Sequence, residues 1–457
     1  MTTIRPLILR FEKDVLITLA IFLLAVILRA PYFDYPPGHV FDEGFFVWYV
    51  TNTSYGTPFF ELHPPLSWMI FSAVVPEVSE AGDPSQYLTL ANTRQSFDFF
   101  PYEKLRLLNV FLGSLLPVIV YFIGRLLGFG VRFALLPASF VILDNALILY
   151  SRLMLPDTLL LLLGLSAVAA ALAARRFIGL PAILSVVASG ILAGLAASVK
   201  WTGFGFALSV ALALIFIKRS KLAAVLFGLV VFITYTGVFF YYFDHMEMGP
   251  VDTSRGFFRG ERIESLRFPG RAPVGEELQA TFEYSRAIFE THKNPPPNLA
   301  AGMNRGSPLR WPLSMAPLRI WNSSYDGSFM ILLGNPLTWS VAFIAMFVSI
   351  WFLVVNVMRR FRPFQDHQDH RHLIFLLFSY GFSFVPFLFV GRQLFMNTYL
   401  PALIFSYLLI PSVFKLLLPK ISIVGLTDEK KEQVIFFVLL AGASLVSLSV
   451  SPMTYGF

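Results

Sequence analysis

The sequence predicts an all-α polytopic membrane protein, and three observations support this fold class. Of its 457 residues, 56% are hydrophobic and only 14% are charged, whereas a soluble globular protein carries about 25% charged residues. The mean hydropathy is +0.67. The apolar residues also fall into long runs, and the charges gather between them. This composition excludes a soluble enzyme and a disordered regulator.

Eleven apolar runs approach the length of about 20 residues that a spanning helix needs. In chain order they are 15–30, 105–124, 133–149, 158–174, 180–199, 203–217, 222–243, 336–358, 373–390, 396–418 and 434–449. The fifth and sixth runs meet at Lys200 without a loop between them. We therefore expect about eleven transmembrane helices.

Basic residues in the short connecting segments predict the orientation, because they favour the cytoplasmic side. With a cytoplasmic N-terminus, every inner segment is basic, from Arg5 and Arg10 at the start to Lys430 and Lys431 near the end. The C-terminus is then expected outside. The first run has no small-residue cleavage site behind it, so we interpret it as an anchor and not as a removable signal peptide.

Two outer segments are long, at about 31–104 and about 244–329, and both are rich in Pro, Gly and aromatic residues. Loops of this length are usually functional. Neither is long enough to predict a separate domain, so residues 1–457 are treated as one integral-membrane domain. The sequence has no cysteine, which excludes disulfides and thiol catalysis. The net charge of +7 reflects membrane orientation, and no nucleic-acid partner is expected.

Five basic residues depart from the rule that basic residues favour the cytoplasmic side, because they stand at the outer ends of predicted helices: Arg29, Arg106, Arg152, Lys200 and Arg392. Each is costly at membrane depth unless it is paired or hydrated. For any one of them, snorkelling to the interface or pairing with Asp144 or Asp157 is a sufficient explanation. For all five together, a shared anionic partner such as a lipid phosphate is the better explanation.

The first outer segment carries acidic residues and a histidine in a stiff, aromatic-rich stretch. Asp42 and Glu43 follow Tyr35-Pro36-Pro37, and His63 precedes Pro64-Pro65. Adjacent carboxylates point in different directions, so one can act as a base while the other pairs with a cation. An Asp-Glu pair alone is more often a solvated loop. In this setting it indicates an active-site platform.

These residues resemble the dolichyl- or polyprenyl-phosphate-mannose protein O-mannosyltransferases of the MIR-free, prokaryotic type. The resemblance rests on blocks in the family order: Tyr-Pro-Pro-x-x-Val-Phe-Asp-Glu at 35–43, His-Pro-Pro-Leu at 63–66, Leu-Asp-Asn-Ala-Leu at 143–147, Ser-Arg at 151–152, Ser-Val-Lys-Trp-Thr-Gly at 198–203, Ser-Pro-Leu-Arg-Trp-Pro at 307–312, Gly-Asn-Pro at 334–336 and Tyr-Leu-Pro-Ala-Leu at 399–403. One departure is clear, because Asn397-Thr398 stands where the family usually has His.

The resemblance implies a C-type glycosyltransferase fold, a lipid-linked mannose donor and Ser/Thr acceptors in proteins. The second outer segment is too short for the β-trefoil MIR domain of eukaryotic members. The nearest alternative is a transferase of the same fold that moves aminoarabinose or arabinose. A flippase or transporter of a polyprenyl-linked sugar is a further alternative, although its charges should lie near the bilayer middle.

The resemblance also suggests roles for individual residues. Asp42 matches the position of the family's acidic base, in a reaction that inverts the sugar configuration. Glu43 is expected to shape the pocket by pairing with Arg29 or Arg106. Arg152, Lys200 and Arg392 are expected at the donor phosphate, and His63 and Tyr399 are further candidates for substrate binding. No metal and no cofactor are expected, because cations would stabilise the departing phosphate.

Overall fold

The structure is a computed structural model, and it describes residues 4–80, 87, 97, 99–251, 261–295, 307–323, 326–358, 368–390, 393–420, 422 and 426–457. All eleven predicted apolar runs are helical in it. The helices that correspond to them are α1 (Ile4–Arg29), α6 (Tyr102–Leu126), α7 (Val131–Leu143) with α8 (Asn145–Tyr150), α9 (Asp157–Ala173), α10 (Leu180–Val199), α11 (Gly203–Leu212), α12 (Lys221–Asp244), α16 (Pro336–Met358), α17 (Gln368–Phe384), α18 (Leu400–Leu417) and α19 (Asp428–Tyr455).

Three of these runs are less regular than the sequence predicts. The third run is broken at Asp144, whose backbone is extended and whose carboxylate accepts a hydrogen bond of 2.9 Å from the Leu147 amide. Asp144 thus ends α7 and caps α8, which is what a short acceptor side chain does at a helix start. The sixth run closes in a π-helical turn at Ala213–Ile217, and the ninth continues into a 3-10 turn at Val385–Phe389.

The membrane character of the chain follows from these helices. By length and composition, seven helical segments among the described residues can cross a membrane; they include α6, α10, α12, α16 and α19. The helices α7, α9 and α11 are also apolar, but they are shorter, even when α11 is counted together with the turn Ala213–Ile217 that follows it. The chain is therefore a multi-pass membrane protein, and the total of eleven spans stays a prediction.

The two long outer segments fold mainly as short helices. The first contains α2 (Glu43–Ser54), α3 (Leu66–Val74) and α4 (Glu77–Glu80), and the second contains α13 (Glu261–Glu264) and the longer α14 (Val274–Lys293). Two small antiparallel hairpins depart from the all-α prediction: β1 (Gly249–Pro250) with β2 (Arg267–Phe268), and β3 (Leu318–Asn322) with β4 (Phe329–Leu332).

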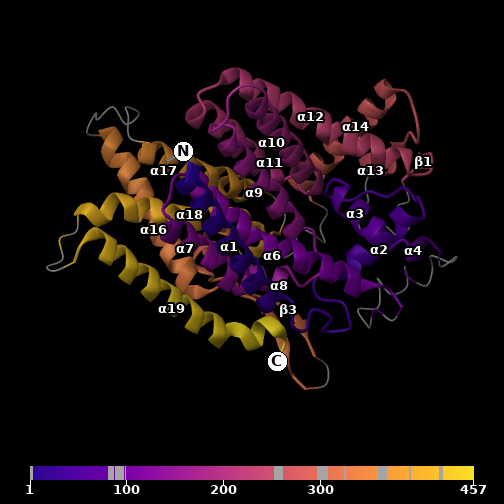
Figure 1. Ribbon diagram of the computed structural model, residues 1–457. Helices are drawn as coiled ribbons and strands as arrows, with labels where there is room; N and C mark the ends of the chain where they lie inside the picture. The colour runs from indigo at the N-terminus through magenta and orange to yellow at the C-terminus, as the bar shows by residue number, and fades with distance from the viewer. Residues whose placement is uncertain are drawn as a thin grey trace.

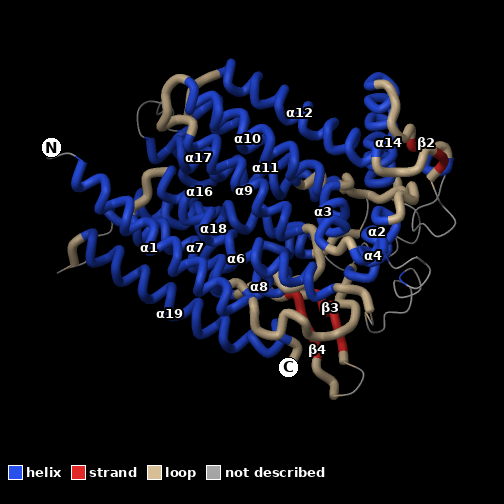
Figure 2. The backbone as a smooth tube through the Cα atoms, turned by 45° about the vertical axis from the view of Figure 1, so that its right-hand side comes forward, coloured by secondary structure: helices blue, strands red, loops and turns tan. Residues whose placement is uncertain are grey.

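The elements of the two outer segments lie at one end of the helical bundle. Figure 1 shows α2, α3, α4 and α14 together on one side, and Figure 2 shows the N-terminus at the opposite end. The α19 helix ends where α1 ends, because the Tyr455 hydroxyl donates a hydrogen bond to the Leu28 carbonyl. The start of α1 and the end of α19 thus lie at opposite ends of the bundle. Which end faces the cytoplasm stays a prediction.

The helix α18 forms the centre of the bundle. Its residues from Leu400 to Val413 are all buried, which is unusual for a span that meets lipid. It packs against α7, α16 and α17, and of these α16 keeps an exposed apolar face. The bundle therefore provides a rigid frame, and the loops at its outer end carry the candidate site.

Candidate active site

Asp42 stands at the junction between a tight loop and the start of α2. Phe41, just before it, has a backbone φ of +54°, a left-handed conformation that costs a residue with a side chain roughly 1–2 kcal/mol. The Phe41 amide donates a hydrogen bond of 3.2 Å to the Ile320 carbonyl on β3. The Asp42 side chain is half-buried and does not cap the helix itself. The loop thus presents Asp42 at the surface of the outer end.

Glu43 has a different environment from its neighbour, because it is fully buried. Its Oε1 atom accepts hydrogen bonds from Arg106 Nε at 2.9 Å and from the Met154 amide at 2.7 Å. Its Oε2 atom accepts from Arg106 Nη2 at 2.7 Å and from the Val40 amide at 3.0 Å. Four donors fill the four acceptor positions of a carboxylate. Glu43 is therefore a positioning residue and is not available as a base.

Arg106, on α6, is the partner of Glu43 and is equally buried. Besides the two bonds to Glu43, its guanidinium donates to three loop carbonyls, those of Pro36 at 2.8 Å, Gly38 at 3.1 Å and Asp34 at 3.2 Å. An arginine has five N–H donors, and all five are used. The prediction that Arg106 contacts a donor phosphate is therefore wrong; it holds the loop that carries Asp42.

Arg29 and Arg152 are also engaged with the protein itself. The Arg29 guanidinium donates to the Val141 carbonyl at 2.9 Å, and so ties α1 to α7. The Arg152 guanidinium donates to the carbonyls of Thr454 and Tyr32 and lies 4.4 Å from the centre of the Tyr455 ring. Both are buried, and the cavity described below does not include them. The structure therefore does not bring them to one shared anionic partner.

Among the four predicted outer cations that the structure describes, Lys200 is the one that lines the cavity described below. It follows the last residue of α10, and its ammonium group lies 3.1 and 3.3 Å from the two carboxylate oxygens of Asp157 at the start of α9. Asn397 donates a long hydrogen bond of 3.4 Å to the same carboxylate. Pairing with Asp157 is one of the explanations that the sequence suggested for a single cation at this end. The two hydrogen bonds to Asp157 leave one of the three ammonium N–H groups of Lys200 able to bind an anion.

The cavity beside Lys200 has a volume of about 500 Å³. One part of its wall is polar and basic, with His63, Lys200, His292 and Lys293. The remainder is mostly apolar: Trp201, Phe204, Leu208, Phe289, Phe382, Pro386, Phe387, Phe389, Val390 and Leu394, with Thr202, Gly205 and Thr398 between them. A cavity that combines basic side chains with a mostly apolar wall suits a ligand that has an anionic head and a hydrocarbon tail.

Asp42 is not among the residues that line this cavity, but its neighbour Phe41 contacts a segment that does. The Phe41 ring packs against Phe395 at 5.5 Å, and Phe395 follows the cavity residue Leu394. Asp42 also acts electrostatically on Tyr49 of α2. Burial, the adjacent Glu61 and then Asp42 raise the pKa of the Tyr49 hydroxyl well above its ordinary value. Glu61 in turn lies two residues before His63 of the cavity wall. Asp42 thus adjoins two segments that form the cavity.

Two other predicted residues have different outcomes. Tyr399 is buried in an aromatic cluster, 5.3 Å from Trp339 and 6.2 Å from Tyr380 between ring centres. Its neighbour Thr398 lines the cavity instead. Arg392 lies outside the described residues. Sequence reasoning missed His292 and Lys293, because the end of α14 reaches the cavity only through tertiary packing. In the sequence, the one feature that pointed to these two residues was the unusual length of the second outer segment.

Asp144 connects helices and takes no part in the cavity. Its carboxylate accepts hydrogen bonds from the Trp339 indole at 2.6 Å and from the Tyr407 hydroxyl at 2.9 Å, so it joins the α7–α8 break to α16 and α18. Within the described residues no three His, Asp or Glu side chains gather as a metal site would require. A reaction without metal stays a prediction.

Comparisons with known proteins are consistent with this arrangement. Residues 19–245 match the family model described as dolichyl-phosphate-mannose-protein mannosyltransferase. Residues 277–457 match the C-terminal four-transmembrane region of protein O-mannosyltransferase. Dolichyl-phosphate-mannose–protein mannosyltransferase 1 of Saccharomyces cerevisiae is 29% identical over 206 residues, which are 44% of this chain and 24% of that protein. Protein O-mannosyltransferase 1 of Drosophila melanogaster is 31% identical over 132 residues, 28% of this chain and 14% of that protein.

The matched stretches thus span a quarter or less of the length of these relatives. Solved structures show the shared fold. The Saccharomyces cerevisiae protein O-mannosyltransferase Pmt1–Pmt2 complex bound to the sugar donor aligns with a TM-score of 0.77 and 16% identity, over 97% of this chain and 90% of that chain. The Archaeoglobus fulgidus oligosaccharyltransferase aligns with a TM-score of 0.54 and 13% identity, over 97% and 56%. The predicted C-type glycosyltransferase fold is confirmed, and the two family models, which together cover most of the chain, show that it belongs to the protein O-mannosyltransferase family.

Proposed function

We propose that this chain transfers mannose from a polyprenyl- or dolichyl-phosphate-mannose donor to Ser/Thr hydroxyl groups of proteins. The family membership and the donor printed in the relatives' names support this reaction class. The structural observation that carries the proposal is the cavity of about 500 Å³, whose lining combines Lys200 and Lys293 with a mostly apolar wall. A sugar phosphate linked to an isoprenoid combines the same two chemistries.

The basic end of the cavity would hold the donor phosphate. Lys200 is fixed by Asp157, so its ammonium group is oriented before a ligand arrives. Lysine provides a point charge to a phosphate, and charge-assisted bonds are roughly twice as strong as neutral ones. Lys293 and the rings of His63 and His292 would add donors around the same head group. The isoprenoid would lie along Phe204, Leu208 and Phe389.

Asp42 would act as the base. Its carboxylate takes the proton of the acceptor hydroxyl while that oxygen attacks C1 of mannose, and the bond from C1 to the phosphate oxygen breaks on the opposite face with inversion. The products are the O-mannosyl protein, the polyprenyl phosphate and a protonated Asp42, which returns its proton to water. Half-buried Asp42 is suited to this role, whereas Glu43 has every acceptor position filled.

The remaining assignments belong to the same proposal. No metal or cofactor takes part, because Lys200 and its cationic neighbours stabilise the departing phosphate. The N-terminus is cytoplasmic, and the site and the C-terminus lie at the outer face of a cell membrane. The chain acts as one integral-membrane domain, and its partners are the lipid donor and Ser/Thr-containing proteins.

A transfer assay tests the reaction. Full-length protein in detergent is given polyprenyl-phosphate mannose and a Ser/Thr-containing peptide, and the product is analysed by mass spectrometry. We expect a peptide that is heavier by one hexose and that releases mannose on β-elimination. Transfer to a lipid A acceptor alone, or from an aminoarabinose donor alone, would contradict the proposal and favour the same-fold alternative.

A further inference from the structure

The helix α14, in the second outer segment, presents one face to the rest of the protein. Tyr284 packs 5.5 Å from Phe239 of α12, and its hydroxyl accepts a hydrogen bond of 2.9 Å from the Glu61 amide. Ser285 lies 3.1 Å from the Tyr235 hydroxyl on α12. The buried residues Ala287 and Ile288 belong to the same side. This face attaches α14 firmly to a spanning helix.

A second face of α14 is apolar and yet exposed. Val274 is 69% exposed, Phe282 57% and Phe289 55%. At roughly 100° per residue, these three and the half-buried Leu278 fall within about 80° of the helix circumference. Ser285, which contacts Tyr235, falls on the same arc, so the stripe runs along Val274, Leu278 and Phe282 and resumes at Phe289. Apolar stripes of this kind on a soluble surface mark an interaction site.

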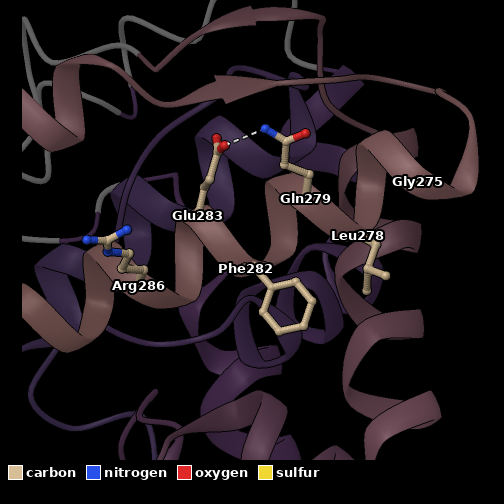
Figure 3. A pocket seen from close by; sticks show the side chains of 6 residues that line it. All are labelled: Gly275, Leu278, Gln279, Phe282, Glu283 and Arg286. Carbon is tan, nitrogen blue, oxygen red and sulfur yellow. Dashed lines mark hydrogen bonds between the residues drawn. The ribbon is translucent and has the colours of Figure 1, made fainter.

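A third face of α14 is polar and exposed. Gln279 donates a hydrogen bond of 2.8 Å to Glu283, and Arg286 donates one of 3.1 Å to Glu290. Figure 3 shows the two exposed faces diverging: Leu278 and Phe282 point to one side of the helix, and Gln279 and Glu283 point to the other. The helix therefore has one face that packs against the rest of the protein, one exposed apolar face and one exposed polar face.

The position of α14 relative to the spans identifies the apolar partner. Trp201 and Tyr235 lie at the same level as the C-terminal part of α14, with the Trp201 indole donating to the Tyr235 hydroxyl at 3.1 Å and its ring 6.3 Å from His292. Trp and Tyr concentrate where a membrane meets water. Figure 2 shows α14 running across the end of α12, not along it. Below this level, α12 exposes Leu229, Phe232 and Ile233, as a lipid-facing span does.

We propose that α14 lies in the membrane interface, with Val274, Phe282 and Phe289 immersed in the outer leaflet of the lipid bilayer and Gln279 and Glu283 in water. The three-sided distribution is what a helix at that boundary requires. The helix that carries the apolar stripe contacts α12 at Tyr235 and Phe239 and lies beside the aromatic pair Trp201–Tyr235. If a second copy of the chain covered the stripe instead of lipid, the position of α14 at the level of Trp201 and Tyr235 would have no explanation.

The placement has a consequence for the cavity. Phe289 belongs to the apolar stripe and also lines the cavity that contains Lys200. With α14 in the interface, this wall of the cavity lies at the depth of the lipid head groups. The inference depends on the membrane character of the chain and not on the reaction that it catalyses.

Single-cysteine labelling tests the placement directly, because the chain has no native cysteine. The full-length variants Val274→Cys, Phe282→Cys, Gln279→Cys and Glu283→Cys are spin-labelled and reconstituted into phosphatidylcholine–phosphatidylglycerol vesicles. Collision rates are measured with oxygen, which concentrates in lipid, and with a water-soluble nickel chelate. We expect the ratio of oxygen to nickel collisions to be severalfold higher at positions 274 and 282 than at 279 and 283.

Two results would overturn the proposal. Equal ratios at positions 282 and 283 would place both faces in the same medium. Spin–spin broadening at position 282 that disappears on dilution with unlabelled protein would show that the stripe contacts a second copy. The pair 274 and 279 repeats the comparison about one to two turns toward the start of α14, so a variant that fails to fold does not remove the test. Transfer activity is not a readout here, so failure of the proposed reaction would leave the result intact.

Discussion

Arg106 and Glu43 form a buried ion pair in which the guanidinium binds both carboxylate oxygens, at 2.9 and 2.7 Å. The pair joins α6 to the start of α2, and the remaining donors of Arg106 hold the carbonyls of the loop at 34–38. Asp42 is the next residue to Glu43 but remains half-buried. One carboxylate of the Asp-Glu pair is thus used to build the site, and its neighbour is the one that we propose as the base.

Replacing Glu43 by Gln should destabilise the protein. The change leaves the Arg106 charge buried and uncompensated, and breaking one partner of a buried pair costs about 3–5 kcal/mol. Arg106→Met should have a similar effect. Both are measured by thermal or denaturant unfolding of the protein in detergent. Asp42→Asn is the control one residue away and should change stability by less than about 0.5 kcal/mol. Wild-type stability of the Glu43 variant would show that the pair does not hold the loop.

Replacing Lys200 by Met should weaken donor binding. Loss of a charge-assisted contact costs about 1.5–3 kcal/mol, or roughly 10- to 100-fold in Kd. Because the single change leaves Asp157 unpaired, the variant Lys200→Met/Asp157→Asn removes both charges and separates binding from folding. Binding of polyprenyl-phosphate mannose is measured by calorimetry, with Arg286→Met as a control cation on α14. Unchanged affinity in the double variant would remove Lys200 from the phosphate site.

His39 should make the acidic loop sensitive to acid. Burial lowers the pKa of His39 below its ordinary value of 6.5; Arg106 lowers it further, and Glu43 opposes the shift. The unfolded chain therefore binds a proton at a higher pH than the folded chain does. The folded state loses stability as the pH falls through about 6.5 toward the lowered pKa, and retains it above.

The pH effect is measured as the unfolding midpoint between about pH 5 and 7, where histidine titrates. His39→Asn should flatten the dependence in this window while leaving the midpoint at higher pH nearly unchanged. An identical slope in the variant and the wild type would assign the acid sensitivity to other groups.

Gly113→Ala should strain the packing of α6. A Cβ atom at this position would lie 2.2 Å from the Cβ of Ser151, which precedes Arg152. Overpacking of this kind costs about 1–3 kcal/mol. The matched control is Gly237→Ala on α12, where a Cβ meets no atom within 4 Å of the described structure, and where alanine favours the helix. Equal unfolding temperatures for the two variants would contradict the close approach at Gly113.

The helices were predicted well from the sequence because each one corresponds to a continuous run of apolar residues. The ranges 180–199 and 336–358 coincide with α10 and α16. The break at Asp144 was not predicted, because an apolar run does not reveal which polar residue will cap a new helix. The β1–β2 hairpin was missed because its strands contain only two residues each.

The candidate site was predicted less completely, because its contacts are long-range. The sequence placed five cations at the outer end but could not show that Arg29, Arg106 and Arg152 bind backbone carbonyls. Such partners carry no sequence signal, since every residue has a carbonyl. Lys200 and His63 were predicted as site residues and do line the cavity. His292 and Lys293 reach it from α14, about 90 residues further along the chain than Lys200.

The role of Asp42 is tested most directly by comparing the wild-type protein with Asp42→Asn in the same preparation. Mannosyl transfer to a Ser/Thr peptide and binding of polyprenyl-phosphate mannose are both measured. Loss of a general base typically costs roughly 10²–10⁴-fold in rate. We predict a loss of turnover of at least this order with donor affinity and unfolding temperature unchanged. Turnover close to that of the wild type would contradict the assignment of Asp42 as the base.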